Sequence, residues 1–316
     1  MPVRKISLAS GVWPSCFWPT RRIVPGTRDP GSVVSFKKPV AIDQISEDWK
    51  LKLNELVVAI KGAGEMASAV AWRIYMSNIK QILMLETPSP LAVRREVSFC
   101  EAVHDGCQTV EGVEACRADD DAAIREIWNR EKIAVIVDPE WKILDPFQPD
   151  VAIDALLAKK NLGTNMSEAP LVIGLGPGFV AGKDVHLVVE TNRGHNLGRI
   201  LTSGSAEPNT GVPGPIGGYA AERVLRAPCD GEFRTECAIG DLVKKGDVIA
   251  TVEADVVRAK IDGALRGLFR SSSRVSRGLK LGDIDPRGDV DYCYTISDKA
   301  RAISGSVLEA ILRVYN

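Results

Sequence analysis

Apolar runs that alternate with stretches of helical periodicity begin at residue 57. Residues 57–60 are apolar without interruption, as expected for a strand buried on both faces of a parallel sheet. Beyond a short turn, Met66, Val70 and Ile74 recur at helical spacing. Further strands are predicted at 81–86, 133–137, 151–153, 171–175 and 185–190, and a helix over 91–104. This alternation predicts an α/β fold with a Rossmann-like parallel sheet.

The turn after the first strand matches the G-x-G-x-x-A pattern. Gly62 permits a tight turn, Gly64 lets a phosphate approach the backbone, and Ala67 lets helix and strand pack closely. The free N–H groups of the helix, which begins near Glu65, face such a ligand. The next strand ends at Glu86, where a ribose-binding acid is expected. We therefore predict cofactor binding at Gly62, Gly64, Glu65 and Glu86; the alternative is a fold whose glycines only pack.

Three further polar residues lie near predicted strand ends. Arg94 and Arg95 follow the second strand and are predicted to clamp an anion beside the ribose or phosphate, although a solvated basic turn is equally consistent. Asp138 ends another strand, at the sheet edge where ligands bind in open α/β folds. An aspartate before proline is also an ordinary turn residue, so both interpretations stay open.

A second glycine turn and a polar run follow the last two predicted strands. Glycines 174, 176 and 178 surround Pro177 and suit a loop whose amides point at an anion. The run 190–199 places a carboxylate, a guanidinium and an imidazole at a strand exit. We predict catalytic or binding roles for Glu190, Arg193 and His195, whereas His186, inside a strand, is expected to be structural. The cofactor-binding predictions here are Gly174, Gly176 and Gly178.

The rest of the chain divides into four parts around this domain, which is expected at 53–202. Residues 1–52 are expected to be a disordered basic tail, because the first 40 hold six prolines, seven Lys/Arg and one acid. Residues 203–226 form a Gly/Pro-rich connection, 227–290 a small β domain, and 291–316 a terminal helix.

The predicted β domain contains an internal repeat. Positions recur at an offset of 32: Asp230-Gly231 as Asp262-Gly263, Val243 as Val275, and Gly246 as Gly278. Two such copies predict a small barrel or sandwich. The repeat resembles the biotinyl/lipoyl barrel-sandwich hybrid fold, whose carrier domains display a lysine at a hairpin tip. That lysine is absent here, since Lys260 lies one step into the next strand, so the resemblance implies the fold and not the carrier role.

Composition excludes several classes of protein. The net charge of −1 gives no general attraction to nucleic acid or membrane, and no apolar run is long enough to span a bilayer. Seven dispersed cysteines without a C-x-x-C pair favour reduced thiols in a cytoplasmic protein. Three histidines argue against a multi-histidine metal centre, and we expect no metal site.

Taken together, the ordered motifs GAGEMASAVA, AKKNLGT, LVIGLGPGF, VVETNRGHNLG, LKLGDIDPR and ISDKARAISGSVLEAIL resemble the selenium-dependent molybdenum hydroxylase system protein family. The resemblance covers about residues 54–316. It implies an accessory factor in the maturation of molybdenum hydroxylases, such as xanthine dehydrogenase-like enzymes, with the apo-hydroxylase as partner. The resemblance carries over no catalytic residue.

Two classes of function follow from these features. As a maturation factor, the protein would bind the molybdenum cofactor, for instance as molybdopterin dinucleotide, and Cys100, Cys107 or Cys116 would handle a chalcogen as thiolate. As an NAD(P)-dependent oxidoreductase, it would use the glycine turn and Glu86, with His195 as the candidate proton donor. A non-catalytic scaffold is a third possibility, and the sequence leaves open whether any catalysis occurs.

Overall fold

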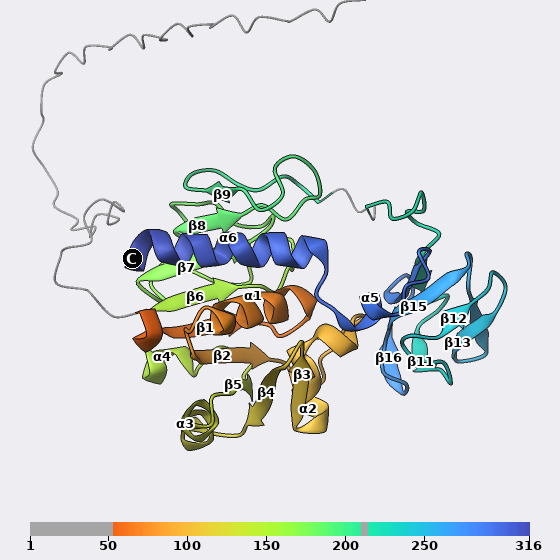
Figure 1. The fold of residues 1–316 in the computed structure, drawn as a ribbon, viewed down its shortest axis with the longest axis horizontal. Coiled ribbons are helices and arrows are strands. Elements are labelled where there is room, and N and C mark those ends of the chain that lie inside the picture. The colour runs from red at the N-terminus through yellow and green to blue at the C-terminus, as the bar shows by residue number, and fades with distance from the viewer. Residues whose placement is uncertain (1–52, 210–213) are drawn as a thin grey trace, which may run out of the picture. The chain divides into compact units, whose positions relative to one another are not determined.

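The computed structural model describes residues 53–209 and 214–316 (Figure 1). The tail predicted over 1–52 lies outside these residues. The described part of the chain forms a mixed α/β structure with one large sheet, two small antiparallel sheets and a C-terminal helix. No helix in this part is long and apolar enough to cross a membrane.

The large sheet has nine strands in the order β3-β4-β5-β2-β1-β6-β7-β8-β9. The seven central strands, β4 to β8, are parallel, while the edge strands β3 and β9 are antiparallel to their neighbours. Their bounds are β1 Val57–Lys61, β2 Gln81–Glu86, β3 Cys107–Val110, β4 Val113–Ala118, β5 Ile133–Val137, β6 Val151–Asp154, β7 Leu171–Leu175, β8 Leu187–Val189 and β9 Ile200–Leu201. The prediction of one mainly parallel sheet is confirmed.

Strand β1 lies between β2 and β6, so the strand order reverses there. Such a switch point opens a crevice at the carboxyl ends of the strands, the usual ligand position in open α/β sheets. The segments that follow β1, β2, β6, β7 and β8 all leave the sheet at this one edge.

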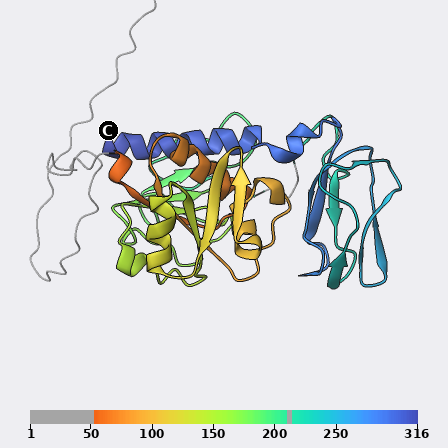
Figure 2. The same ribbon diagram turned by 60° about the horizontal axis from the view of Figure 1, so that its bottom comes forward.

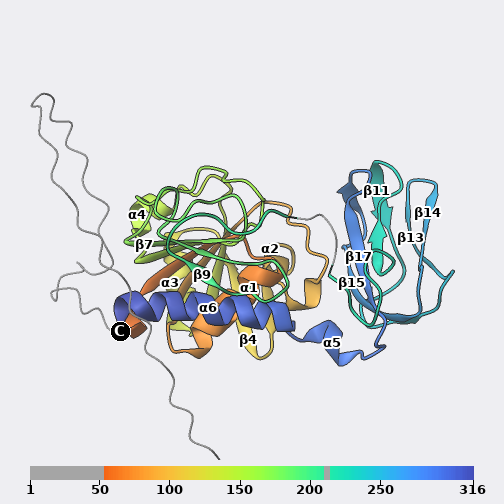
Figure 3. The ribbon, with the colours of Figure 1, turned by 90° about the horizontal axis from the view of Figure 1, so that it is seen from above.

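Helices cover both faces of the sheet. Helix α1, Glu65–Met76, and helix α6, Asp298–Tyr315, lie side by side on one face, where Val58 and Ile60 also point (Figures 1 and 3). Figure 2 shows α6, in blue, extending along the sheet. On the other face, Ala59 packs with α3, Asp121–Asn129, and α4, Leu144–Phe147. This alternation of Val58, Ala59 and Ile60 is what a strand buried on both faces requires.

One predicted helix is broken into short turns. Instead of one helix over 91–104, the structure has 3₁₀ turns Arg95–Val97 and Phe99–Glu101, followed by α2, Ala102–Asp105. The segment is held by contacts with distant parts of the chain, such as a hydrogen bond from Arg95 Nε to the carbonyl oxygen of Leu268 (2.8 Å). Tertiary contacts thus override the local helical preference here. The segment between β6 and β7 contains no helix.

Eight short strands form the two small antiparallel sheets, which share one apolar core. The sheet orders are β10-β17-β15-β12 and β14-β13-β11-β16. The bounds are β10 Val224–Arg226, β11 Gly231–Arg234, β12 Leu242–Val243, β13 Val248–Val252, β14 Asp255–Arg258, β15 Gly263–Leu268, β16 Ser273–Val275 and β17 Lys280–Asp285. We call residues 224–285 the β domain; its first strand begins inside the stretch expected as a connection. Helix α5, Asp291–Tyr294, follows it.

The two copies of the sequence repeat exchange strands within the β domain. In the first copy, β11 and β13 belong to one sheet and β12 to the other, and the second copy, with β15, β17 and β16, reverses this assignment. The copies also hold each other's turns. The backbone N–H of Lys245 donates to Asp262 Oδ1 (2.7 Å). The equivalent N–H of Arg277 donates to Asp230 Oδ1 over the same distance. The predicted duplication is thus expressed as an approximate two-fold arrangement.

The hairpin tip of the β domain lacks the group that a carrier domain needs. Strands β13 and β14 are joined by Glu253 and Ala254 alone, so no lysine stands at the tip. We expect the protein to be neither biotinylated nor lipoylated, and intact mass spectrometry of protein from its native host checks this. A carrier-group mass on Lys260, the nearest lysine after the hairpin, would contradict the prediction.

Candidate functional site

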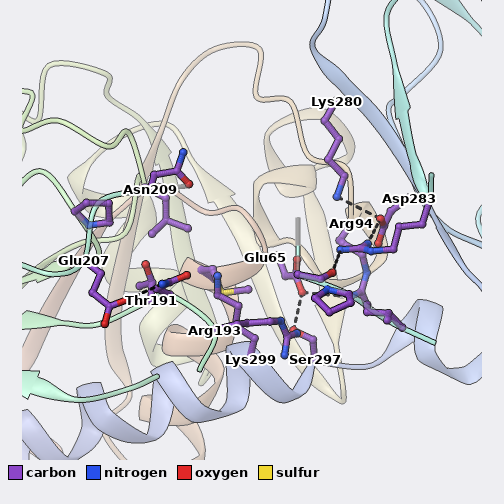
Figure 4. A pocket seen from close by; sticks show the side chains of 18 of the residues that line it. Glu65, Arg94, Thr191, Arg193, Glu207, Asn209, Lys280, Asp283, Ser297 and Lys299 are labelled. Atoms are coloured by element: carbon purple, nitrogen blue, oxygen red, sulfur yellow. Dashed lines mark hydrogen bonds and ion pairs between the residues drawn. The ribbon is translucent and has the colours of Figure 1, made fainter. Parts of the chain in front are cut away.

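A cavity of about 830 Å³ opens at the carboxyl edge of the large sheet (Figure 4). We call it the main cavity. Its walls come from the segments that follow β1, β2, β6, β7, β8 and β9, from the first turns of α1 and α6, and from the β-domain strands β15 and β17. Its volume lies within the range of pockets that enclose small molecules and cofactors. The ligand position expected at the switch point is therefore a real cavity, and the β domain forms one wall of it.

Cationic side chains dominate the wall of the main cavity. Six lysines and arginines line it against three acidic residues, although the whole chain has a net charge of −1. The cations are Arg94, Arg193, Arg223, Arg266, Lys280 and Lys299, and the acids are Glu65, Glu207 and Asp283. A concave site lined by one sign of charge attracts ligands of the opposite sign. The site is therefore suited to an anion.

Two helix N-termini meet at the main cavity. Glu65 begins α1 and Ser297 caps α6, and the hydroxyl of Ser297 donates to Glu65 Oε1 (2.9 Å). Arg94 Nη1 donates to the same oxygen (3.2 Å), so it offsets the negative charge of Glu65. Helix N-termini carry a partial positive charge and free N–H groups, both of which stabilise a bound anion.

Lys299, in the first turn of α6, is a half-buried cation of the main cavity. Its amino group makes no hydrogen bond or ion pair with the residues that the structure describes. Burial lowers the pKa of Lys299, and the neighbouring charge of Arg193 lowers it further. An anionic ligand would offset both effects, because a nearby negative charge favours the protonated amine.

A smaller cavity of about 340 Å³ lies over the glycine turn. Gly62, Gly64 and Glu86 line it, and it shares Glu65, Met66 and Leu157 with the main cavity. The carboxylate of Glu86 accepts hydrogen bonds from the backbone N–H groups of Ala63 and Thr87, both at 2.8 Å. The acid expected to bind a ribose is thus in the cavity wall and also holds the glycine turn in place.

The predicted clamp of Arg94 and Arg95 connects the large sheet with the β domain and α5. Arg94 Nη2 donates to the carbonyl oxygens of Tyr292 and Thr295, both at 2.9 Å. Arg95 reaches Leu268 instead and does not line either cavity. Only Arg94 is therefore placed to contact a ligand.

The second glycine turn is packed against its neighbours. A Cβ atom on Gly174 would lie 2.5 Å from the ring of Phe179, and one on Gly176 would lie 2.5 Å from Thr191 Oγ1. Gly178 has φ +118° and approaches the backbone of Lys160 closely. Pro177, between these glycines, lines the main cavity, so the turn shapes the wall through close packing.

We expect Gly178→Ala to lower the free energy of unfolding by about 3 kcal/mol or more, because it combines an unfavourable backbone conformation with overpacking. The added Cβ would lie 2.8 Å from backbone atoms of Lys160, which cannot move aside cheaply. Gly204→Ala is the matched control: its φ is +77° and nothing lies within 4 Å of the added atom. Urea unfolding of both variants checks the difference, and equal losses would contradict the packing role.

The polar residues after β8 have two different roles: Glu190 supports the loop, and Arg193 lines the main cavity. Glu190 is buried, and its oxygens accept the backbone N–H groups of Asn192 (2.6 Å) and Glu207 (2.7 Å). Arg193 lines the main cavity and forms a bidentate ion pair with Asp298 (2.8 and 2.9 Å). This pairing with Arg193 holds the pKa of the Asp298 carboxyl well below its usual range.

The remaining predicted residues lie outside both cavities. His195 is exposed, on the same loop as Arg193. Asp138 accepts the backbone N–H of Ile143 (2.8 Å), as expected of a turn residue. His186 Nδ1 accepts the backbone N–H of Val172 (2.9 Å), in line with its expected structural role. The catalytic role of His195 stays a prediction that the geometry does not support directly.

Sequence motifs did not indicate the residues that the β domain, α6 and the positions just before each of them bring to the main cavity: Arg223, Arg266, Lys280, Asp283, Ser297 and Lys299. A signal for three of them is present in the repeat. At the offset of 32, Arg223, Lys280 and Asp283 correspond to Asp255, Val248 and Thr251 of the other copy. Such differences between duplicated units mark positions that the repeat itself does not require.

The expectation of reduced cysteines is wrong for one pair. Cys107 and Cys116 face each other in the β3–β4 hairpin, with Cα atoms 4.1 Å apart, and form a disulfide. The two cysteines are nine positions apart in the sequence, so they form no C-x-x-C pair that would have predicted the disulfide. Cys100 is a buried thiol in the wall of the smaller cavity, and burial raises its pKa far above the usual range. None of these three sulfurs is a thiolate in this state.

Metal-ligand side chains gather at one place in the described part of the chain. Ligand atoms of Cys107, Glu114 and Cys116 lie within 4.8 Å of one another. Two of these residues form the disulfide, so their sulfurs are not thiolate ligands.

No protein-family model matches this chain. A search of curated proteins finds 49% identity over 260 residues with a protein of Escherichia coli K12. The chain is similar to the uncharacterized protein YqeB. The alignment covers 82% of this chain and 48% of YqeB, so the chain spans about half the length of that relative.

Solved structures resemble this chain only distantly. Product-bound EutE (DoeB) of Ruegeria pomeroyi, an ectoine utilization protein, is 13% identical with a TM-score of 0.22, covering 66% of this chain and 59% of its own. An aspartoacylase family protein of Mesorhizobium loti is 14% identical with a TM-score of 0.24, covering 72% and 84%. TcdA (CsdL) is 9% identical with a TM-score of 0.28, covering 86% and 94%. Likeness at this level does not identify a function.

Proposed function

We propose that this protein binds the molybdenum cofactor, in a nucleotide form, and acts as an accessory factor in the maturation of selenium-dependent molybdenum hydroxylases. The main cavity carries the proposal, because six cations and two helix N-termini converge on one enclosed volume. A pterin dinucleotide presents phosphate groups, which such a site stabilises. Its partner would be the apo-hydroxylase in the cytoplasm.

The architecture supports the same proposal. We assign the large sheet to the Rossmann-like class, because its strand order reverses at β1 and a glycine turn follows that strand. We assign the β domain to the barrel-sandwich hybrid class, because its two repeats exchange strands between the sheets. In this proposal the β domain serves as a wall of the ligand site, since its hairpin tip carries no lysine.

An NAD(P)-dependent oxidoreductase is the second candidate. The smaller cavity favours it, because Gly64 and Glu86 line a space next to the N-terminus of α1. Against it, the exposed His195, which is its candidate proton donor, lines neither cavity. An oxidoreductase reaction with a bound dinucleotide would therefore need a residue other than His195 as the proton donor.

Mass spectrometry of small molecules released from protein purified from its native host tests the proposal. A molybdopterin nucleotide supports it, and NAD(H) or NADP(H) supports the oxidoreductase. In cells that lack the protein, we expect a selenium-dependent hydroxylase to accumulate without activity. Full hydroxylase activity in those cells, with no pterin released from the protein, would contradict the maturation function.

A further inference from the structure

One of the two sheets of the β domain, β10-β17-β15-β12, contributes to the wall of the main cavity. Strands β15 and β17, with the residue before β10, supply the cations there. Their equivalents in the other repeat lie in or beside the opposite sheet, among β11, β13 and β14. Arg266 is matched by a second arginine, Arg234, but three other charged residues have equivalents of different charge, so the fold does not demand their charge. The pairs are Arg223 and Asp255, Lys280 and Val248, and Asp283 and Thr251.

Two buried arginines at this wall have donors without partners. Arg94 is 6% exposed and Arg223 is 8% exposed, and both side chains line the main cavity. The Nε atom of each has no hydrogen-bond partner among the described residues. Leaving a buried donor unpaired costs about 1–3 kcal/mol, and more where the group is charged. Each of these donors requires an explanation, and an anionic ligand at this wall provides one for Arg94 and Arg223.

The ion pairs at this wall leave an excess of positive charge. Arg223 Nη1 pairs with Asp283, and its Nη2 donates to the carbonyl oxygen of Gly214 (3.2 Å). Lys280 Nζ lies 3.5 Å from the same carboxylate. Asp283 therefore neutralises one of its two neighbours. Figure 4 shows Lys280 and Asp283 on the β-domain side, with Arg193 and Lys299 next to α6.

We propose that Lys280 of the β domain forms a second anion subsite together with Arg223, the residue before that domain, and Arg94, in addition to the subsite of Arg193 and Lys299 at α6. The ligand of the main cavity therefore carries two anionic groups of the phosphate type, one held by each side. This inference rests on the proposed function, in which the cavity binds an anionic cofactor. It assigns the β domain a direct role in recognising that ligand.

Equilibrium dialysis with radiolabelled inorganic phosphate tests the two subsites separately. We expect the wild-type protein to bind two phosphates per chain. Lys280→Val, which introduces the residue of the other repeat, should weaken binding at one subsite about tenfold, the loss expected for one charge-assisted hydrogen bond. Lys299→Met should weaken the other subsite by a similar factor.

The matched control is Lys244→Ser, which removes an exposed β-domain lysine outside the cavity and introduces its repeat equivalent, Ser276. It should bind two phosphates normally. Thermal unfolding checks that each variant is folded, and Lys280→Gln replaces Lys280→Val if the latter is not. If Lys280 variants bind as the wild type while Lys299→Met loses a phosphate, the β-domain subsite is wrong and the proposed function stands. If the wild type binds no phosphate, both are contradicted.

Discussion

Replacing Gly64 with valine will abolish ligand binding and leave the protein folded. Gly64 has φ −71° and ψ −176°, an extended conformation that valine adopts readily, and nothing lies within 4 Å of an added Cβ. The free energy of unfolding should change by less than about 1 kcal/mol, as for substitutions that disturb no packing. The side chain would instead enter the smaller cavity at the N-terminus of α1, which adjoins the main cavity at Glu65, and would block the part of the ligand that lies over the glycine turn. We expect at least a hundredfold loss of affinity for the ligand.

Gly62→Ala serves to distinguish the loss of ligand affinity expected for Gly64→Val from a loss of stability caused by strain in the glycine turn. Gly62 has φ +90°, and its added Cβ would lie 3.2 Å from Leu156 Cδ2. This variant should therefore lose stability by about 1–2 kcal/mol, the cost of a left-handed conformation for a residue with a Cβ atom. Urea unfolding and calorimetric titration measure both quantities. Unchanged affinity in a folded Gly64→Val protein would exclude the glycine turn from the ligand site.

Arg193→Ala will remove most of the activation of a selenium-dependent hydroxylase in cells. Its planar guanidinium lines the main cavity beside Lys299, and it fixes Asp298 in the first turn of α6 through two hydrogen bonds. Losing it both removes a cation and leaves the carboxylate of Asp298 uncompensated at the site. We expect ligand affinity to fall about a hundredfold, as when a charged donor and its pairing are lost together. Arg193→Lys should restore little of the ligand affinity, because lysine lacks the planar guanidinium that binds a carboxylate or phosphate through two hydrogen bonds.

Arg199→Ala is the matched control for this loop. Arg199 is an exposed arginine six residues further on that does not line the cavity, so activation and affinity should stay at wild-type levels. His195→Ala in the same assay tests the catalytic role predicted from the sequence. Stability should change by less than about 1 kcal/mol in Arg193→Ala, because ion pairs at exposed positions contribute little. An Arg193→Ala protein that supports full hydroxylase activity would refute the role of this wall.

Local patterns in the sequence predicted the large sheet and the glycine turn correctly. Residues 57–60 and the spacing of Gly62, Gly64 and Ala67 carry this information within a few positions, because periodicity and turn chemistry are local properties. The repeat at an offset of 32 likewise predicted a duplicated β unit, and the reciprocal turn contacts confirm it.

Contacts over long separations in sequence could not be predicted in this way. The hydrogen bond from Arg94 to the carbonyl oxygen of Thr295 joins residues that are 201 positions apart. No local sequence pattern predicts that this contact brings the β domain to the sheet. The same holds for the convergence of Ser297 on Glu65, 232 residues apart, which places a second helix N-terminus at the cavity. Sequence motifs therefore did not predict the part of the main cavity that the β domain and α6 form.

The position of α6 makes the sheet domain discontinuous in the chain. The strands β1 to β9 are complete by Leu201, but the helix that packs beside α1 begins at Asp298, after the β domain. On a ribosome, the face of the sheet under α6 stays open while about a hundred further residues are made. Contacts of such large separation form late, since they close long loops. The β domain is complete at Asp285, before α6 begins, and can fold in that interval, so the ligand site is assembled only when the last helix docks.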